Sequence, residues 1–226
     1  MPERAVKRSN TVKFHKDTFD KTTEERRLKV LEVAMSEFAA NGYNATNINE
    51  IASKAGISIG AMYSYFASKE DLFLAVVNKA YTVLETALKE VNATSHNVFE
   101  MAEGMLRVSR EYALKWPELN QIYLDLTTQA LSKMADRLST QIEPITVHLY
   151  KDMLKKAKND GIIGSDVDED VAAFCIDNIM MMYQFSFSAD YYKERMKIFL
   201  GQEKLDDMVQ TEQKLADFIR NAIMKA

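Results

Sequence analysis

Residues 46–72 read TNINEIASKAGISIGAMYSYFASKEDL, and this stretch decides the fold. Its apolar residues recur at helical spacing until Gly56 interrupts them, and Ser58 can then cap a second short helix. Ser68 and Asp71 form a capping box that opens a third helix. Two short helices joined by a glycine turn predict a helix-turn-helix, a motif that places a helix end in the major groove of DNA.

The preceding sequence predicts one more helix and a basic arm. Thr22 and Glu25 form a capping box, so a helix begins at Thr22 or Thr23. Gly42 ends this helix, because glycine tolerates the left-handed conformation that a helix C-terminus often needs. Residues 1–21 lack periodicity and are predicted to be a mobile arm. The apolar positions that recur along the helix are Leu28, Leu31, Met35, Phe38 and Ala39.

The second short helix of the motif has the residue types that suit a DNA contact. Gly60 lets the backbone approach DNA closely, while Tyr63 and Tyr65 offer hydroxyls to phosphates. Thr46 is expected to cap the helix before the turn. Lys69 lies in the first turn of the following helix, where a cation opposes the helix dipole, and a nearby phosphate would explain it. The alternative is an ordinary helical corner with surface tyrosines.

Residues 27–75 resemble the TetR (tetracycline-repressor-like) family of transcriptional regulators. The matching positions are Phe38, Gly42, Tyr43, Thr46, Ile51, Ala52, Ala55, Gly56, Ile57, Ser58, Gly60, Tyr63, Tyr65, Phe66, Lys69, Glu70 and Leu72. The DNA-contacting residues that follow from the resemblance are Thr46, Ser58, Ile59, Gly60, Ala61, Tyr63, Ser64, Tyr65 and Lys69. Thr46 and Lys69 would bind phosphates, and the small residues of the second helix would lie at base edges.

Composition places the chain among ordinary globular proteins. It has 226 residues, of which 47% are apolar and 27% charged, with only 7 glycines and 3 prolines. No alternating strand pattern is present, so the fold class is predicted to be all-α. The single cysteine suits a reducing compartment, and no signal peptide or apolar span is apparent. We therefore expect a cytoplasmic protein with no membrane partner.

Charge is distributed unevenly along the chain. Residues 1–80 hold 12 Lys/Arg against 10 Asp/Glu, whereas residues 81–226 hold 17 against 23. Such an asymmetry fits an N-terminal part that meets phosphates and a larger part that does not. An ordinary solvated basic tail would give the same imbalance.

Helical periodicity continues beyond the motif, and the resemblance implies a two-domain organisation. The expected parts are a basic arm (1–21), a helix-turn-helix DNA-binding domain (22–68), a linking helix (69–91) and a ligand-binding and dimerisation domain (92–226). Helices are predicted near residues 95–115, 118–137, 139–158, 168–189, 189–200 and 203–224. The resemblance further implies a homodimer that pairs through the last two long helices.

Soft and aromatic side chains in the C-terminal part are candidates for an apolar pocket. The candidate ligand-binding residues are Met105, Tyr112, Trp116, Tyr123, His148, Met180, Tyr183 and Phe187. Each of them could equally be plain core. No metal-ligand spacing and no catalytic motif is recognisable, so we expect neither a metal, nor a cofactor, nor an enzyme.

The prediction from sequence is a DNA-binding regulator, most simply a repressor that a small apolar or amphipathic ligand releases from a palindromic operator. One alternative is an architectural or protein-partner factor of the same fold with no small-molecule inducer. The other is a helical enzyme or binding module with a coincidental helix-turn-helix.

Overall fold

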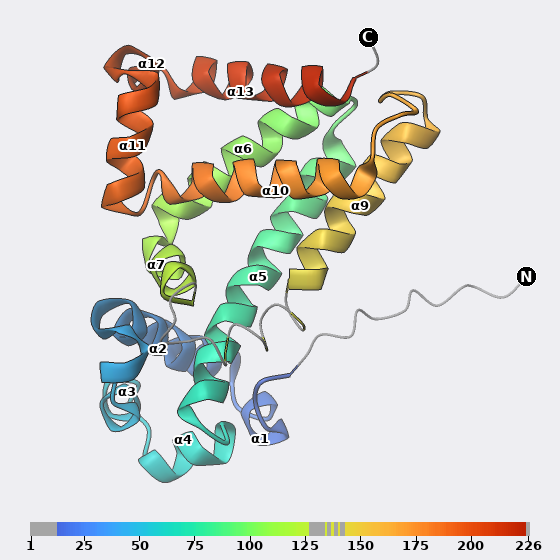
Figure 1. Ribbon diagram of the computed structural model, residues 1–226. Coiled ribbons are helices and arrows are strands. Elements are labelled where there is room, and N and C mark those ends of the chain that lie inside the picture. The colour runs from blue at the N-terminus through green and yellow to red at the C-terminus, as the bar shows by residue number, and fades with distance from the viewer. Residues whose placement is uncertain (1–12, 127–133, 135–136, 138–139, 141–142, 225–226) are drawn as a thin grey trace, which may run out of the picture.

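The computed structural model describes residues 13–126, 134, 137, 140 and 143–224. Every regular element within these residues is a helix, as the all-α prediction requires (Figure 1). The helices are α1 (Asp17–Asp20), α2 (Glu24–Ala45), α3 (Ile48–Lys54), α4 (Ile59–Tyr65), α5 (Lys69–Thr94), α6 (Val98–Lys115), α7 (Pro117–Leu126), α9 (Glu143–Asn159), α10 (Glu169–Phe185), α11 (Asp190–Leu200), α12 (Gln202–Asp206) and α13 (Met208–Ile223). None of them is long and apolar enough to cross a membrane.

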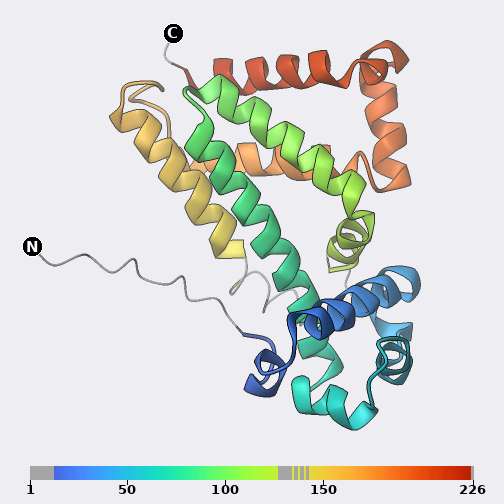
Figure 2. The same ribbon diagram turned by 180° about the vertical axis from the view of Figure 1, so that it is seen from behind.

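Residues 13–77, which we call the head, gather at one end of the molecule (Figures 1 and 2). Their core is dense and aromatic: Phe38, Met62 and Phe66 are 0% exposed. The rings of Phe38 and Phe73 meet edge-to-face at 5.0 Å, so the first turns of α5 belong to this core. Burying such rings is a large hydrophobic stabilisation for a small unit.

The capping residues explain where the head helices begin. Thr23 accepts a hydrogen bond from the backbone of Arg26, and Ser68 accepts one from Asp71. The predicted cap at Thr46 is wrong, because Asn47 caps α3 through its side-chain oxygen. Thr46 is instead buried and donates its hydroxyl to the carbonyls of Glu37 and Gly42.

The end of α2 differs slightly from the prediction. Gly42 has φ +69°, the left-handed conformation expected of it, but it kinks the helix, which continues for one more turn to Ala45. Gly56 has φ +71° in the turn between α3 and α4, with no atom within 4 Å of an added Cβ. Backbone conformation, not crowding, therefore requires glycine at this turn.

The prediction of a mobile arm is wrong for residues 13–21, and residues 1–12 lie outside the described part. Residues 17–20 form α1, and Phe14 and Phe19 are 4% and 2% exposed in the head core. The Phe19 ring lies 4.8 Å from the Phe66 ring. A four-residue helix has no independent stability, so its order depends on these tertiary contacts.

The C-terminal region is a second helical unit through which the rest of α5 runs (Figures 1 and 2). Its core draws on Leu88 of α5, Met105 and Leu106 of α6, Met153 of α9 and Met180 of α10. Both α10 and α13 pack against α6. The predicted stripe residues Ile176 of α10 and Ile219 of α13 are buried.

One buried ion pair joins three of these helices. Arg110 on α6 donates to Glu212 on α13 at 2.7 Å, and Tyr183 on α10 donates to the same carboxylate at 2.8 Å. Glu212 is 5% exposed. Burial and the adjacent carboxylate raise the pKa of Tyr183, so its hydroxyl stays protonated and donating.

The other predicted helices are present within the described residues, but the one predicted near 203–224 is divided at Asp207 into α12 and α13, and the one predicted at 168–189 ends at Phe185. The segment near 189–200 is α11, and the acidic run before α10 is a helix start, because Asp168 accepts hydrogen bonds from the backbones of Asp170 and Val171. The helix predicted at 118–137 is α7 as far as residue 126, and most of its remainder lies outside the described part.

Candidate nucleic-acid interface and ligand cavity

Helix α4 presents its N-terminal end to solvent at the edge of the head (Figure 1). Ser58 caps it by accepting a hydrogen bond from the backbone of Ala61 at 3.1 Å. Met62 anchors the opposite face, being 0% exposed in the head core. Ser58, Ile59 and Gly60 are exposed, so the first turn offers free backbone N–H groups and small side chains to a partner.

Neither crowding nor backbone conformation requires glycine at position 60. It has no positive φ, and a Cβ built there would meet only the Ser58 Oγ at 3.9 Å, an ordinary contact. Glycine costs about 0.5–1 kcal/mol against alanine in a helix interior. The fold does not require this glycine, but close approach of a DNA backbone would.

The two tyrosines of α4 lie in different environments. Tyr63 is 47% exposed and Ser64 is also exposed, so both side chains can reach a partner. Tyr65 is 7% exposed, and its ring packs 5.2 Å from the ring of Phe19. The structure therefore gives Tyr65 a packing role in place of the expected phosphate contact.

The hydrogen bonds of Lys69 explain why a cation lies in the first turn of α5. Its ammonium donates to three carbonyls at the end of α2: those of Tyr43 (2.8 Å), Asn44 (3.3 Å) and Thr46 (2.9 Å). These use all three of its N–H donors. The negative end of the α2 dipole is therefore a partner of this cation within the fold, and the expected phosphate contact stays a prediction. Burial lowers the pKa of Lys69.

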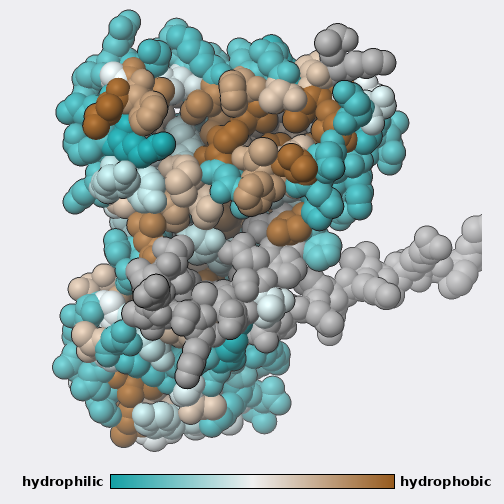
Figure 3. Space-filling view, in the orientation of Figure 1, coloured by the Kyte–Doolittle hydropathy of each residue, from teal (hydrophilic) through white to brown (hydrophobic). Residues whose placement is uncertain are grey.

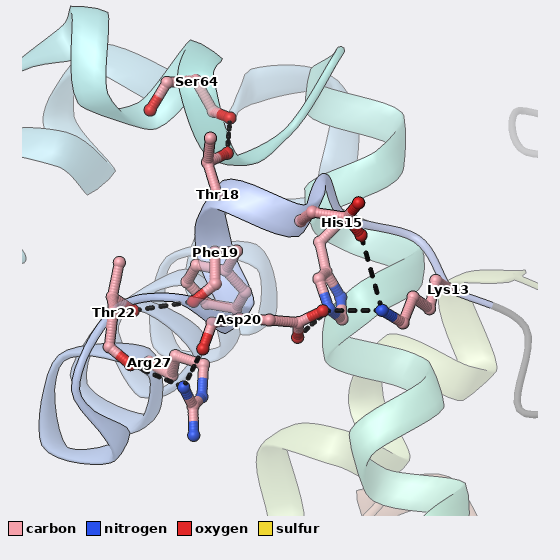
Figure 4. Close-up of polar contacts among 9 residues, drawn as sticks. Lys13, His15, Thr18, Phe19, Asp20, Thr22, Arg27 and Ser64 are labelled. Atoms are coloured by element: carbon pink, nitrogen blue, oxygen red, sulfur yellow. Dashed lines mark hydrogen bonds and ion pairs between the residues drawn. The ribbon is translucent and has the colours of Figure 1, made fainter.

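The segment before α2 caps the other end of α4 (Figure 4). Lys16 donates to the carbonyls of Tyr65 and Tyr63 through its backbone N–H and its ammonium, each at 2.8 Å. Thr18 donates its hydroxyl to the carbonyl of Ser64. A helix leaves its last carbonyls unpaired, and here residues 16–18 supply the donors. We call these contacts, with the Phe19 ring, the α1 clamp.

Side-chain bonds within residues 13–27 hold the clamp in shape (Figure 4). Asp20 pairs with Lys13 and with His15, each at 2.7 Å. Hydrogen bonds from Lys13 and His15 lower the pKa of Asp20. Arg27, on the first turn of α2, donates to the Asp20 carbonyl at 2.9 Å.

A cavity of about 110 Å³ lies between α5, α6, α7, α9 and α10. We call it the ligand cavity. Its walls are mainly aromatic and aliphatic, with polar groups at a few positions. Its lining residues are Val77, Ala80, Tyr81, Leu84, Leu88, Ser109, Tyr112, Trp116, Leu119, Asn120, Ile122, Tyr123, Tyr150, Asp177, Met180, Met181, Gln184 and Phe185.

Half of the expected ligand residues line this cavity. They are Tyr112, Trp116, Tyr123 and Met180. Of the others, Met105 is 1% exposed in the core of the C-terminal region. Tyr183 donates its hydroxyl to Glu212, and the Phe187 ring packs 4.9 Å from the Tyr183 ring. His148 is exposed on α9.

The polar residues of the cavity were missed by the sequence reasoning. Gln184 on α10 donates to the Oδ1 of Asn120 on α7 at 2.7 Å. Asn120 follows Trp116 by one helical turn, and Gln184 follows Met180 by one turn. A polar residue one helical turn after a predicted pocket residue was the sequence signal that could have indicated these two cavity residues.

A second cavity, of about 170 Å³, lies beside α2 and shares part of its wall with the ligand cavity. It is lined by Leu28, Leu31, Glu32 and Met35 of α2 together with residues of α5, α6 and α7. Of the apolar stripe predicted for α2, Phe38 is buried in the head core, and Leu31, Met35 and Ala39 pack against that core. Leu28, Leu31 and Met35 also line this cavity. Both cavities share Ala80, Tyr112, Trp116 and Leu119 as a common wall.

Comparison with known proteins agrees with this geometry. Residues 30–76, which span α2 to the start of α5, match the family of bacterial regulatory proteins called the tetR family. The chain is 26% identical over 161 residues to the uncharacterized HTH-type transcriptional regulator YuxN of Bacillus subtilis, covering 70% of this chain and about half (54%) of that protein. It is 27% identical over 151 residues to the HTH-type transcriptional repressor KstR2 of Mycobacterium tuberculosis, covering 65% of this chain and 73% of KstR2.

The similarity of fold to solved structures extends beyond the helix-turn-helix. The structure of FadR from Bacillus subtilis, a transcriptional regulator in complex with stearoyl-CoA, superposes with a TM-score of 0.65 at 16% identity, covering 85% of this chain and 96% of that one. Such regulators act by binding DNA, not by catalysis. With the capped helix-turn-helix, the matching family segment and the shared all-helical fold, the chain belongs to the TetR family of DNA-binding transcriptional regulators.

Proposed function

We propose that this protein is a repressor that binds a palindromic operator as a homodimer and leaves it when a small ligand enters the ligand cavity. The observation that carries the proposal is the exposed start of α4, where Gly60 has no structural reason to be glycine. Ser58, Ile59, Gly60, Ala61, Tyr63 and Ser64 form the proposed DNA contact. Thr46, Tyr65 and Lys69 support it from inside the head.

Exposed apolar side chains on the last two long helices support a homodimer. Val171 and Phe174 of α10 are 59% and 70% exposed, and Val209 and Phe218 of α13 are 62% and 66% exposed. Apolar surface gathers over this half of the molecule (Figure 3). Monomeric proteins rarely expose large contiguous apolar patches. Pairing of α10 and α13 with those of a second copy would cover these residues, and two copies of α4 would then face adjacent major grooves.

The common wall of the two cavities supplies a route from ligand to DNA. A ligand against Tyr112 and Trp116 displaces side chains that also line the cavity beside α2. The Tyr112 hydroxyl donates to the Val83 carbonyl of α5 at 3.2 Å, which ties the wall to the helix shared by both units. The ligand releases DNA only to the extent that it binds the low-affinity arrangement more tightly.

Selection of binding sites from random-sequence DNA tests the function. We expect an inverted repeat with half-site centres about 34–36 Å apart. A selection that enriches no repeat would contradict the proposal.

Two matched tyrosine variants test the site. Tyr63→Phe and Tyr65→Phe each remove one hydroxyl from α4, but only Tyr63 is exposed. We expect Tyr63→Phe to lower operator affinity about fivefold to tenfold, the value of one lost hydrogen bond, and Tyr65→Phe to leave it unchanged. Titration at one fixed salt concentration measures both, and equal effects would remove the α4 surface from the interface.

The ligand cavity also decides between this function and a factor of the same fold without an inducer. The aromatic and aliphatic walls, with a few polar groups, favour a ligand. If no compound in a thermal-shift panel stabilises the protein while DNA binding persists, the factor without an inducer is the better assignment.

A further inference from the structure

Resting on the proposed ligand-released function, we propose that the ligand cavity takes a neutral, flat, single-ring molecule that presents a hydrogen-bond acceptor to Asn120. This names the class of ligand, which the family relationship does not determine.

The first argument is an unpaired donor. Asn120 lines the cavity and is 3% exposed, and its Nδ2 has no hydrogen-bond partner among the described residues. Its Oδ1 is already occupied by the Nε2 of Gln184 at 2.7 Å. A buried donor without a partner costs free energy, which a ligand acceptor would recover on binding. A carbonyl or ether oxygen meets this need.

The second argument is charge. The described lining contains one carboxylate, Asp177, and no Lys, Arg or His. Burial, and after it the Asp177 carboxylate, raise the pKa of Tyr150, so this phenol stays neutral. An anionic ligand would enter a mainly apolar cavity without a counter-charge and beside a carboxylate, which is unfavourable. A cationic ammonium brings only donors and would leave Asn120 unpaired.

The third argument is shape. Six aromatic side chains line the described walls, namely Tyr81, Tyr112, Trp116, Tyr123, Tyr150 and Phe185. Tyr112 and Trp116 meet at 4.8 Å between ring centroids, and Tyr123 and Phe185 at 5.8 Å. Planar rings stack well on such surfaces. The cavity of about 110 Å³ compares with the roughly 150 Å³ of an engineered apolar cavity that admits benzene, so one ring is the fitting size.

The amide pair also gives the ligand a regulatory position. Asn120 lies on α7, which packs against α2 of the head, whereas Gln184 lies on α10, one of the two proposed dimer helices. The Asn120 Nδ2 has no partner among the described residues that a ligand would have to displace. A ligand bonded to it would nevertheless contact the hydrogen-bonded Asn120–Gln184 pair, which connects α7 with α10.

Calorimetric titration of the full chain with four one-ring probes tests the proposal. Acetophenone carries the acceptor, ethylbenzene lacks it, benzoate adds a negative charge and benzylammonium a positive one. We expect acetophenone to bind at least tenfold more tightly than each of the others. Equal binding of ethylbenzene, preferred binding of either charged probe, or no binding of any probe overturns the proposal.

Two variants locate the effect. Asn120→Leu should abolish the tenfold preference for acetophenone over ethylbenzene, whereas Asn159→Leu, at the exposed end of α9, should keep it. If Asn120→Leu does not fold, the ranking of the four probes on the unaltered protein still decides. DNA selection is run without any probe, so the ligand class can fail while the operator-binding function stands.

Discussion

The two cores of this molecule are packed in different ways. In the head, Phe38, Met62 and Phe66 are completely buried and aromatic rings meet at about 5 Å. In the C-terminal region the core includes Met105, Met153 and Met180. Cavities of about 110 and 170 Å³ lie along α5, the larger one at the boundary with α2 of the head. The difference suits the two tasks that we propose for these regions. A DNA-reading surface must hold one shape, whereas a ligand-responsive region needs room for a guest and for a second arrangement.

The largest expected effect comes from removing a ring of the head. Phe19→Ala deletes a side chain that is 2% exposed, and a change of this kind costs about 3–5 kcal/mol of unfolding free energy. Because Phe19 secures the α1 clamp, operator affinity should fall as well. Chemical denaturation and DNA titration measure the two effects. Phe199→Ala, at a 72% exposed position, is the control and should change stability little.

A matched pair of alanines compares the packing of the two regions directly. Ala34 is 0% exposed in the filled head core, whereas Ala80 lines both cavities. Ala34→Leu should destabilise the protein by about 1–3 kcal/mol through overpacking. Ala80→Leu should be neutral or stabilise it by up to about 1 kcal/mol by filling space. Denaturation midpoints give both values. If the two variants lose equal stability, the cavities are not available space.

The smallest expected effect on stability is that of Gly60→Ala, which should stabilise the fold but weaken DNA binding. Gly60→Ala should raise the free energy of unfolding by about 0.5–1 kcal/mol, because alanine favours a helix and meets no clash. The same methyl group should lower operator affinity by blocking close approach to DNA. Gly56→Ala is the contrasting control, since its positive φ predicts lost stability. Unchanged operator affinity for Gly60→Ala would show that DNA does not approach this turn.

The head could be predicted from the sequence because its signals are local. The caps at Ser58 and Ser68, and the glycine turn at Gly56, act within four residues of the helices they define. The α1 clamp was missed because α1 is too short to leave a periodic pattern and is held by distant partners. The partners of Lys69 within the fold could not be predicted for the same reason, since its three carbonyl acceptors lie more than twenty residues away.

The ligand cavity was only half predictable. Aromatic and methionine residues such as Trp116 and Met180 indicate an apolar interior, but the same residue types also fill ordinary cores. Whether a given one faces a cavity depends on how five helices meet. The Asn120–Gln184 pair joins residues 64 positions apart, so no local pattern could relate them.

The head core also contains Ile122, which lies on α7 and is 1% exposed. A chain is synthesised from its N-terminus, and its domains fold as they emerge. Residues 13–77 therefore leave the ribosome while the place that Ile122 fills is still open. The nascent head stays unfinished until α7 follows, and α7 also carries Asn120. The head core is thus completed only after part of the wall of the ligand cavity has been made.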